Sequence, residues 1–199
     1  MSEIEQRPLS VYIRYQGYFT AEQLASIITS LDDLYNALYP AYDPRITFPL
    51  PPESRLRISQ CRTGDSILLE LLDGIRQVWS SAGPTLQITS GFGIVAVMAR
   101  LIIGFAKGFA EFRKTWYEGT QAKLNAERLR RELEERGWER EMSEEERTEV
   151  HRFPEDIKKR ASEAIINFFI LLEYAPNIEL VQVNGTTIIK DERFQQHGN

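Results

Sequence analysis

The order of apolar and polar residues at the start of the chain predicts a strand followed by a helix. Residues 10–16 place apolar side chains at every second position, which is the period of a half-buried strand. Over residues 21–38 the apolar positions recur every three or four residues, which indicates an amphipathic helix. Thr20 and Gln23 have the spacing of a capping box at its start, and Pro40 is expected to stop it.

Two further segments have the pattern of β-hairpins. Residues 55–61 and 65–72 are apolar runs on either side of a short turn that contains glycine. Near the C-terminus, the segment 178–190 is divided by Asn184 and Gly185, a pair that suits a type I′ turn. The sequence therefore predicts strand, helix and hairpin in its first part, and a second hairpin near its end.

The longest apolar run, residues 91–114, has two sides of different character. At ~100° per residue, Arg100, Lys107 and Lys114 gather on one side, opposite an apolar face. In a single membrane span, Arg100 and Lys107 would each cost about 2.5–3.5 kcal/mol near the centre of the bilayer. The pattern therefore favours an amphipathic helix over a membrane span. We call the following six residues its apolar face: Ile94, Met98, Leu101, Phe105, Phe109 and Phe112.

Three roles are open for this apolar face, namely core packing, contact with a second copy or a protein partner, and contact with a membrane surface. Gly104 and Gly108 have the spacing that lets helices approach closely. The apolar spacing also continues to Leu129 and Leu133, which is typical of a short coiled coil. These two features favour self-association over a membrane surface.

The second half of the chain is predicted to be largely helical. The helix that begins near residue 91 could continue to about residue 136, with Gly119 as a weak point. The segment 127–149 is rich in both Glu and Arg, which is typical of a solvated helix, and a capping box at Ser143 predicts a further short helix. A last helix is expected over 154–174, with apolar residues all round its final turns.

Together these elements predict an α+β protein. Residues 1–82 form an N-terminal β-α-β-β unit, and residues 83–150 form an apolar amphipathic helix that continues into a charged helical arm. Residues 151–199 form a C-terminal helix and β-hairpin that pack on the N-terminal unit. The residues predicted to form the core are Ile13, Leu24, Ile28, Leu31, Ile58, Leu69, Ile165, Phe168, Leu172 and Val181.

Composition narrows the classes of protein to be considered. A chain of 199 residues with 42% hydrophobic and 27% charged residues is long and apolar enough to bury a core, which excludes global disorder. Its net charge of -5 gives no electrostatic reason to bind nucleic acid, so no nucleic acid is expected as a partner.

Cysteine usage and the N-terminal segment bear on location. Cys61 is the only cysteine, so no intrachain disulfide can form, and we expect it to be a small buried side chain on a strand. The N-terminal residues lack the basic and then apolar layout of a secretory signal. These features predict a cytoplasmic protein, or one that is peripheral at the inner face of a membrane.

Candidate chemistry is sparse. The only histidines are His151, within the charged segment, and His197, near the C-terminus. The sequence contains no nucleophile elbow, P-loop, dinucleotide fingerprint or zinc-protease motif. We therefore expect no catalytic residues, no cofactor and no metal, and the sequence favours a role other than catalysis.

Two hypotheses for function follow. The first is a non-catalytic assembly or interaction protein, most simply a homo-oligomer, that acts through the amphipathic helix by self-association, partner contact or membrane-surface contact. The second is a soluble sensing domain that binds a small anionic or nucleotide-like ligand through Arg14, Arg55 and Arg57.

Overall fold

The computed structural model describes most of the predicted elements. The described residues are 8–42, 49–73, 93–117, 143–151, 153–175 and 177–190. The charged arm from residue 118 to residue 142 lies outside them, with Leu129 and Leu133. His197 also lies outside the described residues.

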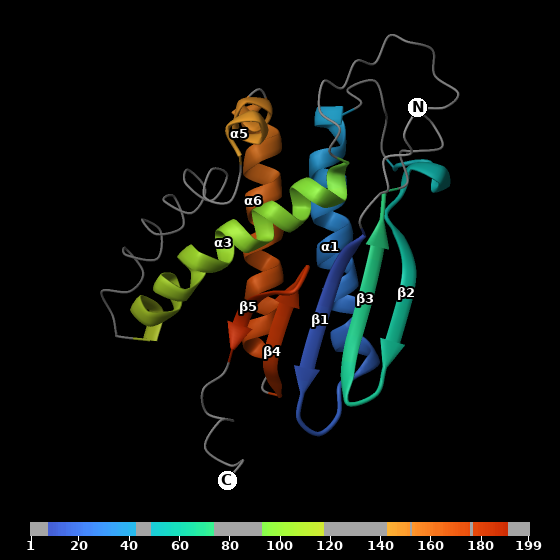
Figure 1. Ribbon diagram of the computed structural model, residues 1–199, viewed down its shortest axis with the longest axis vertical. Coiled ribbons are helices and arrows are strands. Elements are labelled where there is room, and N and C mark those ends of the chain that lie inside the picture. The colour runs from blue at the N-terminus through green and yellow to red at the C-terminus, as the bar shows by residue number, and fades with distance from the viewer. Residues whose placement is uncertain are drawn as a thin grey trace.

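The described strands form one antiparallel sheet. They are β1 (Leu9–Tyr15), β2 (Arg57–Thr63), β3 (Ser66–Leu72), β4 (Ile178–Val183) and β5 (Thr186–Lys190). Their order across the sheet is β2-β3-β1-β4-β5, and every neighbouring pair is antiparallel (Figure 1). The predicted hairpins are confirmed as β2–β3 and β4–β5, and the predicted α+β class is confirmed.

Helices connect the strands in a recognisable order. They are α1 (Ala21–Tyr42), the short 3₁₀ helix η1 (Pro52–Ser54), α3 (Ile94–Tyr117), α5 (Glu144–His151) and α6 (Glu155–Tyr174). The chain runs β1-α1-β2-β3, and later α6-β4, with β1 and β3 adjacent inside the sheet. This is the β-α-β-β-α-β arrangement of split β-α-β folds, with α3 and α5 placed between its halves and β5 added at one edge.

The start of α1 was predicted correctly from its capping residues. The Thr20 amide donates to Gln23 Oε1 at 2.8 Å, and the Gln23 amide donates to Thr20 Oγ1 at 3.1 Å. The reciprocal pair satisfies two amides that the first turn leaves without a helical partner. The helix then begins at Ala21, as expected.

The end of α1 differs from the prediction, because Pro40 lies inside the helix, which continues to Tyr42. A proline inside a helix loses the bond that its own amide would make, and its ring crowds the carbonyl four residues earlier. The residues around it are held by burial: Tyr39 and Tyr42 are both buried, and the Tyr42 ring packs edge-on against Phe153 with centroids 5.9 Å apart. Packing therefore outweighs the local preference of proline.

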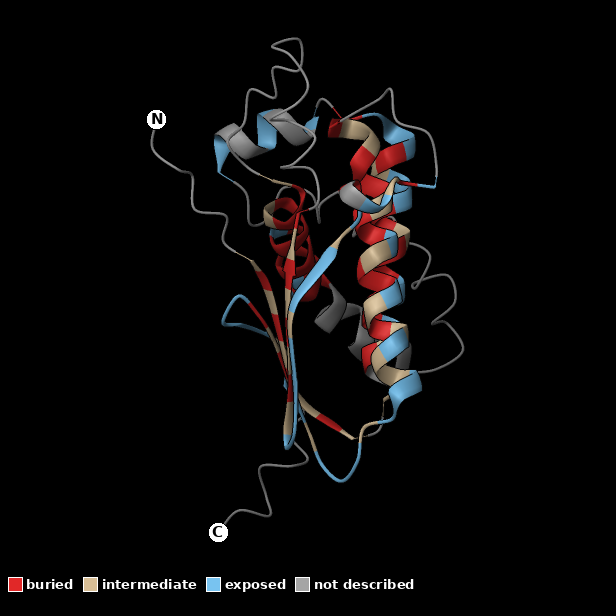
Figure 2. Ribbon diagram, turned by 90° about the vertical axis from the view of Figure 1, so that its right-hand side faces the viewer, coloured by how far each residue is buried: buried red, intermediate tan, exposed pale blue. Residues whose placement is uncertain are grey.

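The sheet has one apolar face and one mixed face. Val11 of β1 lies opposite Leu69 of β3 on one side and Val183 of β4 on the other, and all three are fully buried. The alternate residue Tyr12 is half-buried and Arg14 is exposed. Figure 2 shows the sheet nearly edge-on, with α1 on the side of the apolar face.

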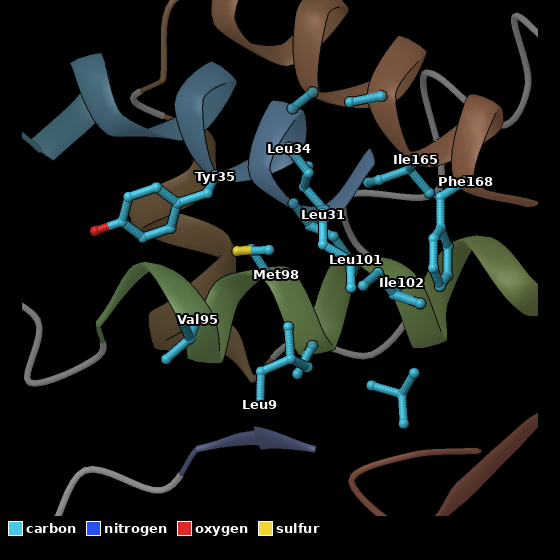
Figure 3. Close-up of a cluster of buried hydrophobic side chains, with 14 of the residues drawn as sticks. Leu9, Leu31, Leu34, Tyr35, Val95, Met98, Leu101, Ile102, Ile165 and Phe168 are labelled. Carbon is cyan, nitrogen blue, oxygen red and sulfur yellow. The ribbon is translucent and has the colours of Figure 1, made fainter. Parts of the chain in front are cut away.

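The helices form two layers over that face. Figure 2 shows α3 as a nearly all-buried helix between the sheet and the pair formed by α1 and α6. The helix α3 contacts α1 and α6 on one side and β1, β4 and β5 on the other, while α1 and α6 pack closely against each other. The helix α3 thus lies between the sheet and the α1–α6 pair, and Leu31 and Leu34 of α1 point toward α3 (Figure 3).

Most predicted core positions are confirmed. Ile13, Leu31, Leu69, Ile165, Phe168, Leu172 and Val181 are buried, and Leu24 and Ile28 are partly buried against the core. Ile58 was predicted wrongly, because its side chain is 47% exposed, and Cys61 is exposed as well. Both lie on β2, which is an edge strand with exposed residues on both of its faces. The period of two in the sequence therefore predicted the strand correctly, but it did not predict whether other elements pack on it.

Candidate functional site

The first part of the apolar face lies inside the protein. Ile94, Met98 and Leu101 are 0% exposed and Phe105 is 1% exposed. Figure 3 shows Met98 and Leu101 on α3, with Leu31 and Leu34 of α1 on one side of the helix and Leu9 of β1 on the other. These four residues of the apolar face therefore serve as core of the protomer.

The flank of α3 next to this apolar face is buried as well. Val95, Ile102, Ile103 and Ala106 are at most 8% exposed, and up to Gly108 only Arg100 and Lys107 are exposed among the described side chains. A helix that is apolar nearly all round is one that is covered on both sides. Gly104 and Gly108 are also buried, so their small size serves the packing of α3 within the protein.

The last part of α3 is described only by its backbone. The backbone of α3 remains helical to Tyr117, so Phe109 and Phe112 lie on the same helix as the buried residues. The side chains from residue 109 onward are outside the described part of the structure. In Figure 1 the end of α3 extends past β5 and past α6, beyond the edge of the sheet. The helix thus has a buried first half and a second half that leaves the layered core.

The three arginines of the sensing hypothesis are not brought together. Arg14 lies opposite Ser66 at the start of β3, whereas Arg57 lies opposite Leu72 at its end, which is roughly 20 Å away at ~3.3 Å per residue. Arg14 Nε is 2.9 Å from the Glu179 carboxylate. Arg55 precedes β2, and its Nε donates to the Leu50 carbonyl at 2.9 Å. Arg14 therefore lies apart from Arg57, and the Arg55 guanidinium is held by a main-chain carbonyl.

A shallow polar groove of about 320 Å³ runs along the outer surface of α1 and α6. Its charged lining residues are Asp33 from α1 and Arg160 and Glu163 from α6. Arg160 pairs with Asp156 at 3.0 Å, so the groove has an acidic balance. Burial raises the pKa of Asp33, and the neighbouring Asp32 carboxylate adds to that rise. Sequence reasoning missed this groove because polar positions on two distant helices carry no signal that they meet.

One buried charge also escaped the sequence analysis. Asp73 follows β3 directly and is only 6% exposed. Its Oδ2 accepts a hydrogen bond from the Val95 amide of α3 at 3.3 Å, while Oδ1 has no hydrogen-bond partner within the described structure. Burial raises the pKa of Asp73 to about 6, although hydrogen bonds from Val95, Tyr35 and Ile94 act in the opposite direction. Because Val95 is 22 positions away, no local pattern indicated this contact.

The described residues do not assemble a metal centre from His, Cys, Asp or Glu side chains. Within them, no group of three or more His, Cys, Asp or Glu side chains could hold a metal ion. His151 is exposed at the end of α5, and Cys61 is exposed on β2. None of the described helices combines the length and the apolar character needed to cross a membrane.

Comparisons of the chain with known protein families, with curated proteins and with solved structures find no match.

Proposed function

We propose that this protein is a non-catalytic assembly or interaction protein, and that it makes contact through the second half of α3. The observation that carries the proposal is the course of this helix. It crosses between the sheet and the α1–α6 pair and ends beyond β5 and α6 (Figure 1). A helix that is partly anchored in a core can present its remaining turns to a partner in a defined direction.

The anchoring is strong because most side chains in the first half of α3 are apolar and buried. Met98 and Leu101 are fully buried, and Phe105 is nearly so. Each such side chain contributes roughly 1.5–3 kcal/mol by leaving water. This half of α3 is therefore committed to the fold of the protomer and is not available to a partner.

The sequence of the second half supports a contact surface. Phe109 and Phe112 continue the spacing of four and three residues from Phe105, so helical periodicity places them on one side. Residues 106–117 span ~18 Å, which is enough for about three turns of helix–helix contact. Aromatic side chains are also those most enriched at protein interfaces. A second copy of this chain is the simplest partner.

The test is a charge placed on this surface. Sedimentation velocity of the purified wild-type protein without detergent is expected to show an oligomer. The Phe112→Asp variant is expected to self-associate more than about tenfold more weakly while it keeps its circular dichroism and melting temperature. Ala110→Asp is the matched control, because it adds the same charge on the opposite side of the helix and is expected to leave the oligomer intact.

Two outcomes would overturn the proposal of self-association. One is a wild-type protein that remains a monomer at all accessible concentrations. The other is a Phe112→Asp variant that assembles like the wild type. Flotation with liposomes of anionic and neutral lipid belongs beside these measurements, because a monomer that floats with liposomes would assign the surface to a membrane instead.

A further inference from the structure

The carboxyl group of Asp73 lies where three elements of the fold meet. Asp73 ends β3, and its Oδ2 accepts a hydrogen bond from the Val95 amide in the first turn of α3. The Tyr35 hydroxyl of α1 and the Ile94 amide of α3 also act on this carboxyl as hydrogen-bond donors. The group therefore joins β3, α1 and the start of the helix that fills the core.

The buried position of this carboxyl group is unfavourable for its charged form. The residue is 6% exposed, and Oδ1 has no hydrogen-bond partner in the described part of the chain. Burial without full hydrogen bonding disfavours the charged form of a carboxyl far more than the neutral form. Burial favours the protonated carboxyl and outweighs the three hydrogen-bond donors, which favour the ionised form.

We propose that Asp73 is a proton-controlled latch on the first turn of α3. The neutral carboxyl holds the turn against β3 and α1, whereas the ionised carboxylate gains free energy when the turn opens and water reaches it. This inference does not depend on the proposed contact surface, because it concerns the opposite end of α3.

Among the described residues, the groups that act on the Asp73 carboxyl do not themselves titrate between pH 4 and 7. From α1 the carboxyl meets Tyr35, and from α3 it meets the main-chain amides of Ile94 and Val95. A tyrosine keeps its proton up to a pH of about 10, and amides do not titrate in this range. Since burial raises the pKa of Asp73 from 3.8 to about 6, the latch changes state between these two pH values.

The size of the effect follows from linkage. If the opened turn lets Asp73 regain its ordinary pKa, a shift of about two units changes the opening equilibrium by about 100-fold. The constant for opening is expected to rise as the pH increases from 4 to 7 and to level off above the pKa of the folded state.

Amide hydrogen exchange on the full chain tests the proposal. The probes are the amides of Val95 and of Val97, which donates to the Gly93 carbonyl in the same turn. After correction for intrinsic exchange, the opening constant of the wild type should rise by up to about 100-fold between pH 4 and 7. The Asp73→Asn variant should show a flat profile. Asp33→Asn should keep the wild-type profile, because Asp33 lies on α1 in the outer groove.

A flat wild-type profile would overturn the proposal, and so would a pH dependence that persists in Asp73→Asn. If the Asp73→Asn variant does not fold, the Tyr35→Phe variant tests the same proposal. This change removes a donor that favours the ionised carboxylate, so the midpoint of the profile should move to higher pH. An unchanged midpoint in Tyr35→Phe would also overturn the latch.

Discussion

Ser10 and Asn184, 174 positions apart in the sequence, exchange two hydrogen bonds. The Ser10 amide donates to Asn184 Oδ1 at 2.8 Å, and the Asn184 amide donates to the Ser10 carbonyl at 2.8 Å. Asn184 also begins the turn of the β4–β5 hairpin, with a left-handed φ of 48°. One residue thus shapes the turn and ties it to the first strand of the sheet.

Substitutions at Asn184 should separate these two roles. Asn184→Ala loses the side-chain bond and also places a Cβ in the left-handed region, so it should destabilise the protein by about 2 kcal/mol. Asn184→Gly loses only the bond and should cost less, because glycine adopts a positive φ without strain. Urea denaturation measures both values. Equal losses in the two variants would show that backbone conformation at this turn contributes little.

The layered packing predicts a large cost for shortening a side chain of α3. Leu101→Ala should lower the free energy of unfolding by about 2–5 kcal/mol, because Leu101 is fully buried between the helix pair and the sheet. Ile58→Ala is the comparison, and it should cost far less because Ile58 is 47% exposed on the edge strand β2. Denaturant midpoints of the two variants check the order. The reverse order would contradict the position of α3 in the core.

Asp73 predicts a dependence of stability on pH with a definite sign. Its folded pKa of about 6 lies above its ordinary value of 3.8, so the stability it contributes is fully present below pH 3.8. That contribution is lost as the pH rises through about 6, and the loss amounts to about 3 kcal/mol for a shift of about two units.

Urea denaturation from pH 3.5 to 7.5 measures the free energy of unfolding of the wild type and of Asp73→Asn. The difference between the two isolates the contribution of Asp73 to stability. The wild type should weaken relative to the variant as the pH rises through that window. A constant difference would mean that Asp73 has the same pKa in the folded and unfolded chains.

The separation of Arg14 from Arg57 predicts weak anion binding. A thermal-shift series with phosphate and nucleotides should leave the melting temperature unchanged, since Arg14 on β1 and Arg57 on β2 lie beside opposite ends of β3. Arg55→Ala combined with Arg57→Ala is the control. A saturable rise in the wild type that disappears in this double variant would contradict the expectation and restore the sensing hypothesis.

Local chemistry was sufficient to predict several elements from the sequence. The start of α1 could be predicted because Thr20 and Gln23 satisfy each other's amides within one turn. The β4–β5 hairpin could be predicted because Asn184 and Gly185 both tolerate a positive φ. In each case the partners lie within a few residues, so the pattern in the sequence contains the whole interaction.

The candidate surface was predicted only in part. The sequence marked the six residues of the apolar face of α3, but it could not say where along the helix the core ends. Ile94 to Phe105 are enclosed because α1 and α6 come from both ends of the chain to cover one side of α3, and the sheet covers the other. The course of the helix past β5, on which the proposed contact surface depends, is likewise a matter of layer geometry.

The sequence by itself determined where most of the described helices and strands form, because periodicity, capping and turn residues act over a few positions. Only the tertiary structure decided which apolar faces are covered. Ile58 and Ile13 occupy strands of similar pattern, yet Ile58 is exposed on an edge strand and Ile13 is buried on an inner strand. Asp73 became a buried carboxyl for the same reason. Burial depends on which distant segment lies above a residue, and that information is not present in its neighbours along the chain.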